Sequence, residues 1–320
     1  ETTPVKDVQF LRYYSKLTLG GNGLSVHYKE DPVHSQLHRE SDPQNITQLI
    51  KSYIENTEKK ISGNVIIPTS GGFDSRLLNI LVSDKAKIKS FTYGISKKQE
   101  ESIETVKARR LSDILKTNWQ QIELGEFNNY TQEWFKIFGP STHLHGMYHI
   151  EFYKKIRSMG KTTDTLLSGI IGDAWSGNVT IDSIDSSEKI KLLGYSHGMN
   201  LNSKYSLLKK TAKTTTKFFS ENCDSLKDSE MRVITSMRFK IMLLSYLVAI
   251  PEYFGYPSWT PFLNMEIAIG MLNINEEEKR ERKWQSDFFR KNGVDLESMN
   301  LVFSKENTLN YESIKIVPIK

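Results

Sequence analysis

Between residues 65 and 167 the sequence alternates short apolar runs with segments of helical periodicity, and this alternation limits the fold more than any other feature. The apolar runs predict strands, and they are Val65–Ile67, Ile88–Tyr93, Trp119–Leu124 and Thr165–Leu167. Strands that are separated by helices pair in parallel, because each helix carries the chain back to the same end of the sheet. The sequence therefore predicts an α/β fold, with a parallel sheet and helices on both of its faces.

The N-terminal part differs from this alternating region. Two short apolar segments flank Gly20-Gly21-Asn22-Gly23, which is typical of the turn of a β-hairpin. A polar connector follows, and a helix is expected to begin at Pro43 with Asp42 as its N-cap. We therefore expect residues 1–40 to form a hairpin and connector that precede the α/β domain.

The C-terminal part is predicted to be helical. After about residue 180 no further strand is expected, and helical patterns occur over 204–222 and 228–250. The prediction is thus a single α/β domain over 41–320 with a helical C-terminal part.

The composition narrows the choice of partners. Lys and Arg number 43 and Asp and Glu 38 among 320 residues, which leaves a net charge of +5. This charge permits an anionic ligand but requires neither a nucleic acid nor a membrane. The single cysteine, Cys223, excludes a disulfide within the chain and a cysteine-ligated metal cluster, and it fits a reducing, cytoplasmic location. No apolar run reaches the 18 residues of a membrane span.

The most specific motif is Ser70-Gly71-Gly72-Phe73-Asp74-Ser75, which lies between the first strand of the alternating region and the helix after it. Two glycines let the backbone turn sharply and approach a ligand, and a helix N-terminus presents N–H groups to an anion. With the hydroxyls of Ser70 and Ser75, and Thr69 just before them, the segment is expected to bind a pyrophosphate. Asp74 would repel that anion unless Mg²⁺ joined carboxylate and phosphate oxygens. A plain glycine turn is the simpler alternative.

Three segments together carry a resemblance to a known family. Ser70–Ser75 resembles the pyrophosphate loop of the N-type ATP pyrophosphatase (PP-loop) superfamily. Leu167-Ser168-Gly169-Ile170-Ile171-Gly172-Asp173-Ala174-Trp175-Ser176-Gly177 resembles the Leu-Ser-Gly-Glu-Gly-x-Asp-Glu string of its asparagine synthetase-like branch. Thr260-Pro261-Phe262-Leu263-Asn264 resembles the Pro-Phe-Leu-Asp element of that branch. The resemblance implies an adenine nucleotide alpha hydrolase-like fold, and an ATP-dependent carbon–nitrogen ligase that adenylates a carboxylate, releases pyrophosphate and forms an amide.

The resemblance also implies roles for residues of the second motif. Ser168 and Gly169 would lie near the nucleotide, and Asp173 would share Mg²⁺ with Asp74 in catalysis. Because ligands bind at the carboxyl ends of parallel strands, an acid that follows the fourth predicted strand is well placed to face the first loop. An Asx turn is the alternative interpretation for Asp173 alone.

Two further residues receive roles from the resemblance. Tyr93, at the end of the second predicted strand, would contact adenine through its backbone. Lys283 would be the catalytic cation that neutralises charge on the phosphates. The charge run over 276–283 is otherwise typical of a solvated helix face.

Two acids of the family pattern are missing. Ile170 and Ala174 stand where the family has Glu. The first Glu is expected to manage the proton of the nitrogen nucleophile, which isoleucine cannot do. The candidate substitute bases are His143, His145, His149 and Glu151. Surface or satisfied core positions are the simpler interpretation for these histidines.

The nitrogen donor stays open. Class II glutaminases begin with a catalytic Cys after the initiator Met, whereas this chain begins at Glu1 and its single Cys is Cys223. Ammonia would then come from solution, from a separate glutaminase or from a removed N-terminal domain, since the hairpin over 10–28 resembles the junction to such a domain. Alternatively, the nucleophile is an amine on the substrate.

Three functions compete on these observations. The first is the amide-forming ligase, acting on a small carboxylate or a sugar acid. The second is a tRNA-modifying relative, which the net charge of +5 allows but which the single cysteine disfavours, since thiolation usually needs further cysteines. The third is a Mg·ATP-binding module that has lost catalysis, and the missing acids at Ile170 and Ala174 motivate it.

Overall fold

The computed structural model describes residues 8, 10–21, 23–139, 146–161, 163–194 and 212–308, with the backbone alone at 212–213 and 241–244. The chain divides into two compact units. The smaller unit combines residues 1–39 with 181–232, and the larger combines 40–180 with 233–320. Residues 181–232, which the sequence assigned to the α/β domain, thus group with the N-terminal segment. The domain boundaries inferred from sequence stay a prediction.

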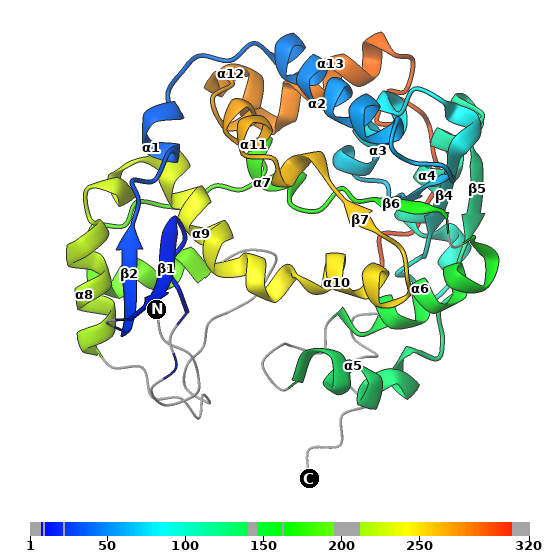
Figure 1. Cartoon of the computed structure of the whole chain (residues 1–320). Helices are drawn as coiled ribbons and strands as arrows, with labels where there is room; N and C mark the ends of the chain where they lie inside the picture. Colours follow the sequence, from blue (N-terminus) through cyan, green and yellow to red (C-terminus); the bar gives the residue numbers. More distant parts are fainter. Residues whose placement is uncertain are drawn as a thin grey trace. The chain divides into compact units, whose positions relative to one another are not determined.

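The larger unit contains a five-stranded parallel sheet in the order β5-β4-β3-β6-β7 (Figure 1). Its strands are β3 Val65–Pro68, β4 Ile88–Thr92, β5 Asn118–Gln121, β6 Thr165–Leu167 and β7 Ser258–Trp259. The predicted fold class is confirmed, and the four predicted strands are present. The expectation that no strand follows residue 180 is wrong, because β7 pairs with β6. Two residues are too few to show a strand periodicity in the sequence.

The direction of the strand order changes between β3 and β6, which is where open α/β sheets bind their ligands. From β3 the chain moves outward to β4 and β5, and it then returns to the other side of β3 as β6. Loops that leave β3 and β6 therefore run in opposite directions, and the carboxyl end of the sheet opens between them. Both sequence motifs follow these two strands, so the topology itself brings them together.

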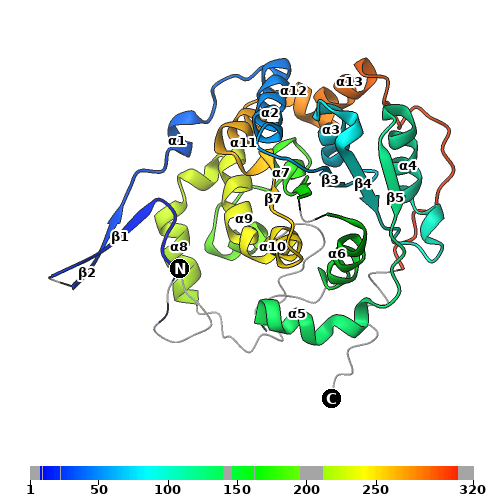
Figure 2. The same ribbon diagram turned by 45° about the vertical axis from the view of Figure 1, so that its right-hand side comes forward.

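Helices cover both faces of this sheet. In Figures 1 and 2, α2 and α3 lie on one side of the strands, and α6 and α10 lie on the other. Ile66, Phe91 and Leu166 join the apolar cluster that includes residues of α6 and α10. The neighbours of Ile66 on β3, Val65 and Ile67, are equally buried. A strand with no exposed face reads as a continuous apolar run, as the sequence has it.

The following helices lie within the larger unit and are given in chain order. They are α2 Pro43–Glu58, α3 Phe73–Leu81, α4 Ile103–Leu115, α5 Thr131–Phe138, α6 Tyr148–Met159, α7 Gly172–Trp175, α10 Tyr246–Tyr253, α11 Met265–Leu272, α12 Glu276–Lys279 and α13 Lys283–Lys291. Asp42 caps α2 as predicted, since its carboxylate accepts from the N–H of Gln44 at 3.0 Å. Among the described helices, none has the length and apolar character that crossing a lipid bilayer requires.

The smaller unit contains the predicted hairpin. Its strands are β1 Ser15–Gly20 and β2 Gly23–Tyr28, which pair antiparallel with Leu19 opposite Leu24. Asn22 of the turn lies outside the described residues. The helices here are α1 Val33–Gln36, α8 Ala212–Asn222 and the start of α9 Ser229–Leu244. The single helix expected over 228–250 is two helices, because α9 ends before α10 begins at Tyr246.

Candidate functional site

The glycine loop between β3 and α3 is the centre of the candidate site. Oγ of Ser70 accepts a hydrogen bond from the N–H of Gly72 at 3.1 Å, and Oγ of Ser75 accepts one from the N–H of Ser70 at 3.1 Å. These hydroxyls hold the loop in shape. Gly72 is the N-cap of α3, so no N-cap side chain satisfies the first N–H groups of the helix. Those groups and the positive end of the helix dipole suit an anion at the loop.

Behind the loop, Asn79 joins α3 to β3 and β4. Its Nδ2 donates to Oγ1 of Thr69 at 2.9 Å and to the carbonyl of Ser75 at 2.8 Å. Its Oδ1 accepts from Oγ of Ser90 at 2.9 Å. Thr69 is buried, and its hydroxyl donates in turn to the carbonyl of Ile67. The side chain of Thr69 is therefore part of the scaffold. Its backbone is engaged as well, since its N–H donates to the carbonyl of Phe91 at 2.8 Å and its carbonyl accepts from Oγ1 of Thr92 at 2.5 Å, so its contact with a nucleotide stays a prediction.

The second motif lies directly against this loop. A Cβ placed on Gly169 would lie 3.3 Å from Cβ of Asp74, and one placed on Gly172 would lie 2.8 Å from Cγ of Asp74. Residues with a side chain at these two positions would push the loops apart. The structure thus brings Asp74 to the segment that carries Asp173, as the sequence expected of a shared metal site.

Asp74 lies in surroundings that favour a bound cation. Burial, and next the charge of Asp173, raise the pKa of Asp74 to about 7, although the charge of Arg282 lowers it. Oδ1 of Asp74 is buried and has no hydrogen-bond partner among the described residues. A buried polar atom without a partner costs about 1–3 kcal/mol. A hard cation that prefers carboxylate oxygens would stabilise the charged form of Asp74 and give its Oδ1 a partner, so the donor set fits Mg²⁺.

The second loop has a strained backbone and an apolar interior. Ile171 has φ of 56°, which is rare for a β-branched residue. Oγ of Ser168 accepts from the N–H of Ile170 at 3.2 Å, which stabilises the turn before it. Ile170 is 5% exposed and Ala174 is 2% exposed. The two positions where the family has acids therefore belong to the packed interior of this loop.

The close approach of Gly172 to Asp74 gives a testable prediction. In Gly172→Ala, the new Cβ would meet Cγ of Asp74 at 2.8 Å and Cε2 of Phe262 at 2.9 Å, so Asp74 must move. We expect Mg·ATP affinity to fall about tenfold, because overpacking of this size costs roughly 1–3 kcal/mol. Gly125→Ala is the matched control, since no atom lies within 4 Å of its added Cβ. Calorimetric titration of both variants checks this, and equal affinities would contradict it.

Lys283, the predicted phosphate cation, lies at the first residue of α13. Its Nζ is 2.7 Å from Oε1 of Glu278 and 3.6 Å from Oε1 of Glu277. The hydrogen bond that Lys283 donates to Glu278 raises the pKa of Lys283, and the charges of both acids add to this. The side chain is 45% exposed. Its ion pairs are thus with the acidic run before it, and its catalytic role stays a prediction.

Two other cations are electrostatically coupled to the carboxylates of the site. The guanidinium of Arg282 lies 4.1 Å from the ring centroid of Phe73, and its charge acts on Asp74. Lys240 of α9 is 3% exposed, and burial lowers its pKa while the charge of Asp173 opposes that effect. Sequence reasoning missed both residues. Arg282 was one cation within a charge run, whereas a lysine inside the apolar pattern of α9 was a signal that could have been used.

An ion-pair brace fastens α3 to the C-terminal segment. Arg76 of α3 is fully buried, and it donates to both carboxylate oxygens of Glu297, at 2.6 and 2.8 Å. It also donates to the carbonyl of Gly71 at 3.1 Å. Lys107 of α4 donates to Oε1 of Glu297 at 2.9 Å. We call these three side chains, Arg76, Lys107 and Glu297, the Glu297 brace, and it holds the glycine loop from behind.

Tyr93 directly follows β4. Its ring packs against those of Tyr148 and Phe152, with centroids 5.2 and 5.1 Å apart. Burial raises the pKa of the Tyr93 phenol well above its usual value. The phenol is thus committed to the core, which is compatible with the expected role of the Tyr93 backbone toward adenine.

The two described candidate bases, His149 and Glu151, have partners away from the two loops. His143 and His145 lie outside the described residues. His149 of α6 is buried among aromatic rings, with Tyr246 at 5.4 Å and Tyr93 at 5.9 Å between centroids. Glu151 is fully buried and accepts from the N–H groups of 125 and 126 and from Lys155 at 2.7 Å. Structural roles account for both described residues.

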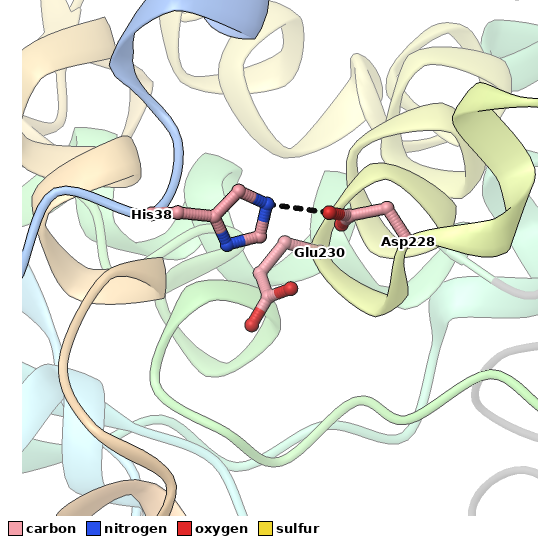
Figure 3. Close-up of side chains that lie close together, drawn as sticks. All are labelled: His38, Asp228 and Glu230. Carbon is pink, nitrogen blue, oxygen red and sulfur yellow. Dashed lines mark hydrogen bonds and ion pairs between the residues drawn. The ribbon is translucent and has the colours of Figure 1, made fainter.

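A separate group of metal-ligating side chains lies in the smaller unit, and it comprises His38, Asp228 and Glu230 (Figure 3). One donor atom of each lies within 4.8 Å of the other two. Nε2 of His38 is 2.5 Å from Oδ2 of Asp228, whose Oδ1 accepts from the N–H of Met231 at the start of α9. In Figure 3 the Glu230 carboxylate points away from this pair. A helix cap with a hydrogen-bonded histidine explains the geometry, and we assign no metal to it.

Comparisons with known proteins add little to this geometry. No protein-family model matches the sequence, and no curated protein matches it either. An NH3-dependent NAD synthetase from Campylobacter jejuni is similar in structure at a TM-score of 0.33 and 16% identity, over 65% of this chain and 96% of that one. An NMN synthetase from Francisella tularensis is similar at 0.33 and 11%, over 69% and 98%. At such scores the likenesses carry no argument about this chain's activity.

Proposed function

We propose that this chain is an ATP-dependent carbon–nitrogen ligase of the PP-loop type. It binds ATP at the carboxyl ends of β3 and β6, transfers the adenylyl group to a carboxylate and releases pyrophosphate. A nitrogen nucleophile then displaces AMP and leaves an amide. The expected acceptor is a small carboxylate or sugar acid, as in the asparagine synthetase-like branch that the motifs resemble.

One observation carries this proposal. The glycine loop presents the N-terminus of a nine-residue helix, and the same loop holds Asp74, whose buried Oδ1 has no partner among the described residues. A carboxylate in an anion-binding site would repel the anion unless a divalent cation binds both the carboxylate and the anion. Loops of this kind at the point where the strand order reverses are where α/β sheets bind nucleotides. Mg·ATP satisfies every part of the arrangement.

The residues of the two loops would have separate roles in binding the phosphates and Mg²⁺. The N–H groups at the start of α3 would bind the phosphates, and Asp74 and Asp173 would hold Mg²⁺. When bound, Mg²⁺ would neutralise charge on the phosphate oxygens. Asn79 and the Glu297 brace keep the loop rigid, so the reacting groups meet in a fixed geometry. Catalysis of this kind rests on positioning and charge neutralisation.

We expect that the side chains at positions 170 and 174 take no proton from the nitrogen nucleophile. Ile170 and Ala174 are buried and carry no group that could accept one. Ammonia from solution or from a glutaminase, or an amine of the substrate, would attack in its neutral form, and the proton that the nitrogen then loses would pass to the departing AMP phosphate or to water. This choice agrees with the structural roles of His149 and Glu151.

Isotope exchange between ATP and pyrophosphate tests the proposal. The chain is incubated with labelled pyrophosphate, ATP and Mg²⁺ against a set of carboxylates that includes uronic acids. We expect exchange that depends on one class of carboxylate, with an adenylated product visible by mass spectrometry. Absence of exchange with every acid offered would overturn the ligase assignment.

A second function is favoured by one observation, namely the apolar packing at Ile170 and Ala174. It is a Mg·ATP-binding module without ligase activity. Calorimetry distinguishes the two, because the module would bind Mg·ATP at the same loop and yet form no adenylate with any member of the carboxylate set.

A further inference from the structure

Arg282 reaches the glycine loop through an unusual turn between α12 and α13. Glu281 and Arg282 have φ of 51° and 57°, so two successive residues with side chains adopt the left-handed conformation. Each such residue costs of order 1–3 kcal/mol, and it persists where packing determines it. Here Trp284 and Phe289 of α13 are buried, and the ring of Phe289 meets that of Phe73 edge-on at 5.1 Å. The anchored helix forces the turn, and the turn places Arg282 beside α3.

The guanidinium of Arg282 is held by a ring. It lies 4.1 Å from the centroid of Phe73, the first residue of α3. A guanidinium over an aromatic face keeps its N–H groups available for an anion, while losing little freedom on binding. Arg76 lies 5.0 Å from the same ring centroid, but its two terminal nitrogens are engaged by Glu297 and by the carbonyl of Gly71, and its Nε is buried.

The two lysines of the charge run have carboxylate partners, as does Arg76 beside the loop, whereas the exposed Arg280 has none among the described residues. Lys283 pairs with Glu278, and Lys279 pairs with Glu276 at 2.8 Å. Arg282 differs from them, since no carboxylate lies within ion-pair distance of it in the described part of the chain. Its position at the start of α3, one residue from Asp74, is where the phosphates of a bound nucleotide would lie. The site thus contains a preorganised cation that acts on Asp74 through its charge and forms no ion pair with a carboxylate of the described residues.

We propose that Arg282 binds the pyrophosphate portion of ATP, and this inference rests on the proposed function. In the adenylation step a carboxylate oxygen forms a bond to the α-phosphorus, and the bond from that phosphorus to the oxygen bridging to the β-phosphorus breaks. The electron pair of that bond leaves with pyrophosphate. The planar, doubly donating guanidinium matches the oxygens on which this charge develops. Arg282 is therefore a phosphate-binding residue, and the predicted role of Lys283 is independent of it.

Binding measurements on the full chain test this inference. We expect Arg282→Gln to weaken binding of Mg·ATP and of Mg·pyrophosphate by roughly ten- to a hundredfold, as for a lost hydrogen bond to a charged group. AMP lacks the pyrophosphate, so its affinity should change less than twofold. Arg280→Gln, which removes an exposed cation of the same charge run, is the matched control, with Mg·ATP affinity unchanged. Arg282→Lys keeps the charge but lacks the paired N–H donors of the guanidinium. Its affinity for Mg·ATP should lie between those of the wild type and Arg282→Gln.

A second variant guards against misfolding at the strained turn. Phe73→Leu keeps Arg282 but removes the ring that holds it, and we expect a several-fold weaker affinity for Mg·pyrophosphate. Melting curves of each variant show whether it is folded. The inference is overturned if folded Arg282→Gln binds Mg·ATP as the wild type does, or loses AMP affinity equally. If the wild type binds no Mg·ATP, the proposed function fails with it, whereas binding that is unaffected by Arg282→Gln leaves the proposed function intact.

Discussion

Asp74→Asn should abolish the exchange of pyrophosphate into ATP, with a rate lower by about a thousandfold or more. The substitution keeps the shape of the side chain but removes the charge that makes its buried Oδ1 a ligand for Mg²⁺. The phosphates would then meet the loop without the cation that joins them to the protein. Calorimetry should show the same loss in Mg·ATP binding, and exchange assays with the best carboxylate measure it.

The fold should survive this substitution. Burial raises the pKa of Asp74 to about 7, which means that the surroundings disfavour the charged carboxylate. A neutral amide in its place should leave the melting temperature equal or higher, as is common where a binding site is strained for function. Asp113→Asn on the exposed surface of α4 is the control and should change neither property. Retention of wild-type exchange by Asp74→Asn would remove Asp74 from the site.

The sheet and the two loops could be predicted because their signals are local. The run at 65–67 is buried and apolar throughout, Leu166 and Leu167 are fully buried, and the glycines at 71 and 72 mark the turn. β7 could not be predicted, because its two residues owe their strand conformation to pairing with β6 rather than to their own pattern. The local sequence pattern thus indicates strands whose own residues are apolar and buried. It misses short strands that form only because they pair with a neighbouring strand.

The cation of the site could not be predicted for a different reason. In the run of acidic and basic residues at 276–283, only the backbone decides which cation faces the loop. The left-handed turn at Glu281 and Arg282 contains no glycine, so the sequence does not indicate it. It follows from how α13 is anchored through Phe289, which is a tertiary contact. Lys283 was chosen from sequence without knowledge of this turn.

The Glu297 brace is likewise a long-range feature, and we expect its loss to have the largest effect on stability. Glu297→Gln removes the charge that two cations share, one of them, Arg76, fully buried. Breaking a buried pair costs about 3–5 kcal/mol, and the 41% exposure of Glu297 reduces this to about 2 kcal/mol. Denaturant unfolding measures the difference. Glu101→Gln, which breaks an exposed pair with Lys98, is the matched control and should cost less than about 0.5 kcal/mol.

The effect of Glu297→Gln should also depend on pH. Burial alone would raise the pKa of Glu297, but the hydrogen bonds and charges of Arg76 and Lys107 outweigh it and lower the pKa to about 2. The unfolded chain has a pKa near about 4.3 for this group. A pKa that folding lowers adds stability above the unfolded value, and this stability is lost as the pH falls through the folded value. The gap between wild type and Glu297→Gln should therefore be constant above about pH 6, shrink below about pH 5 and vanish near about pH 2. A gap that stays constant from pH 7 down to pH 3, in unfolding curves at fixed ionic strength, would show that the brace acts through packing alone.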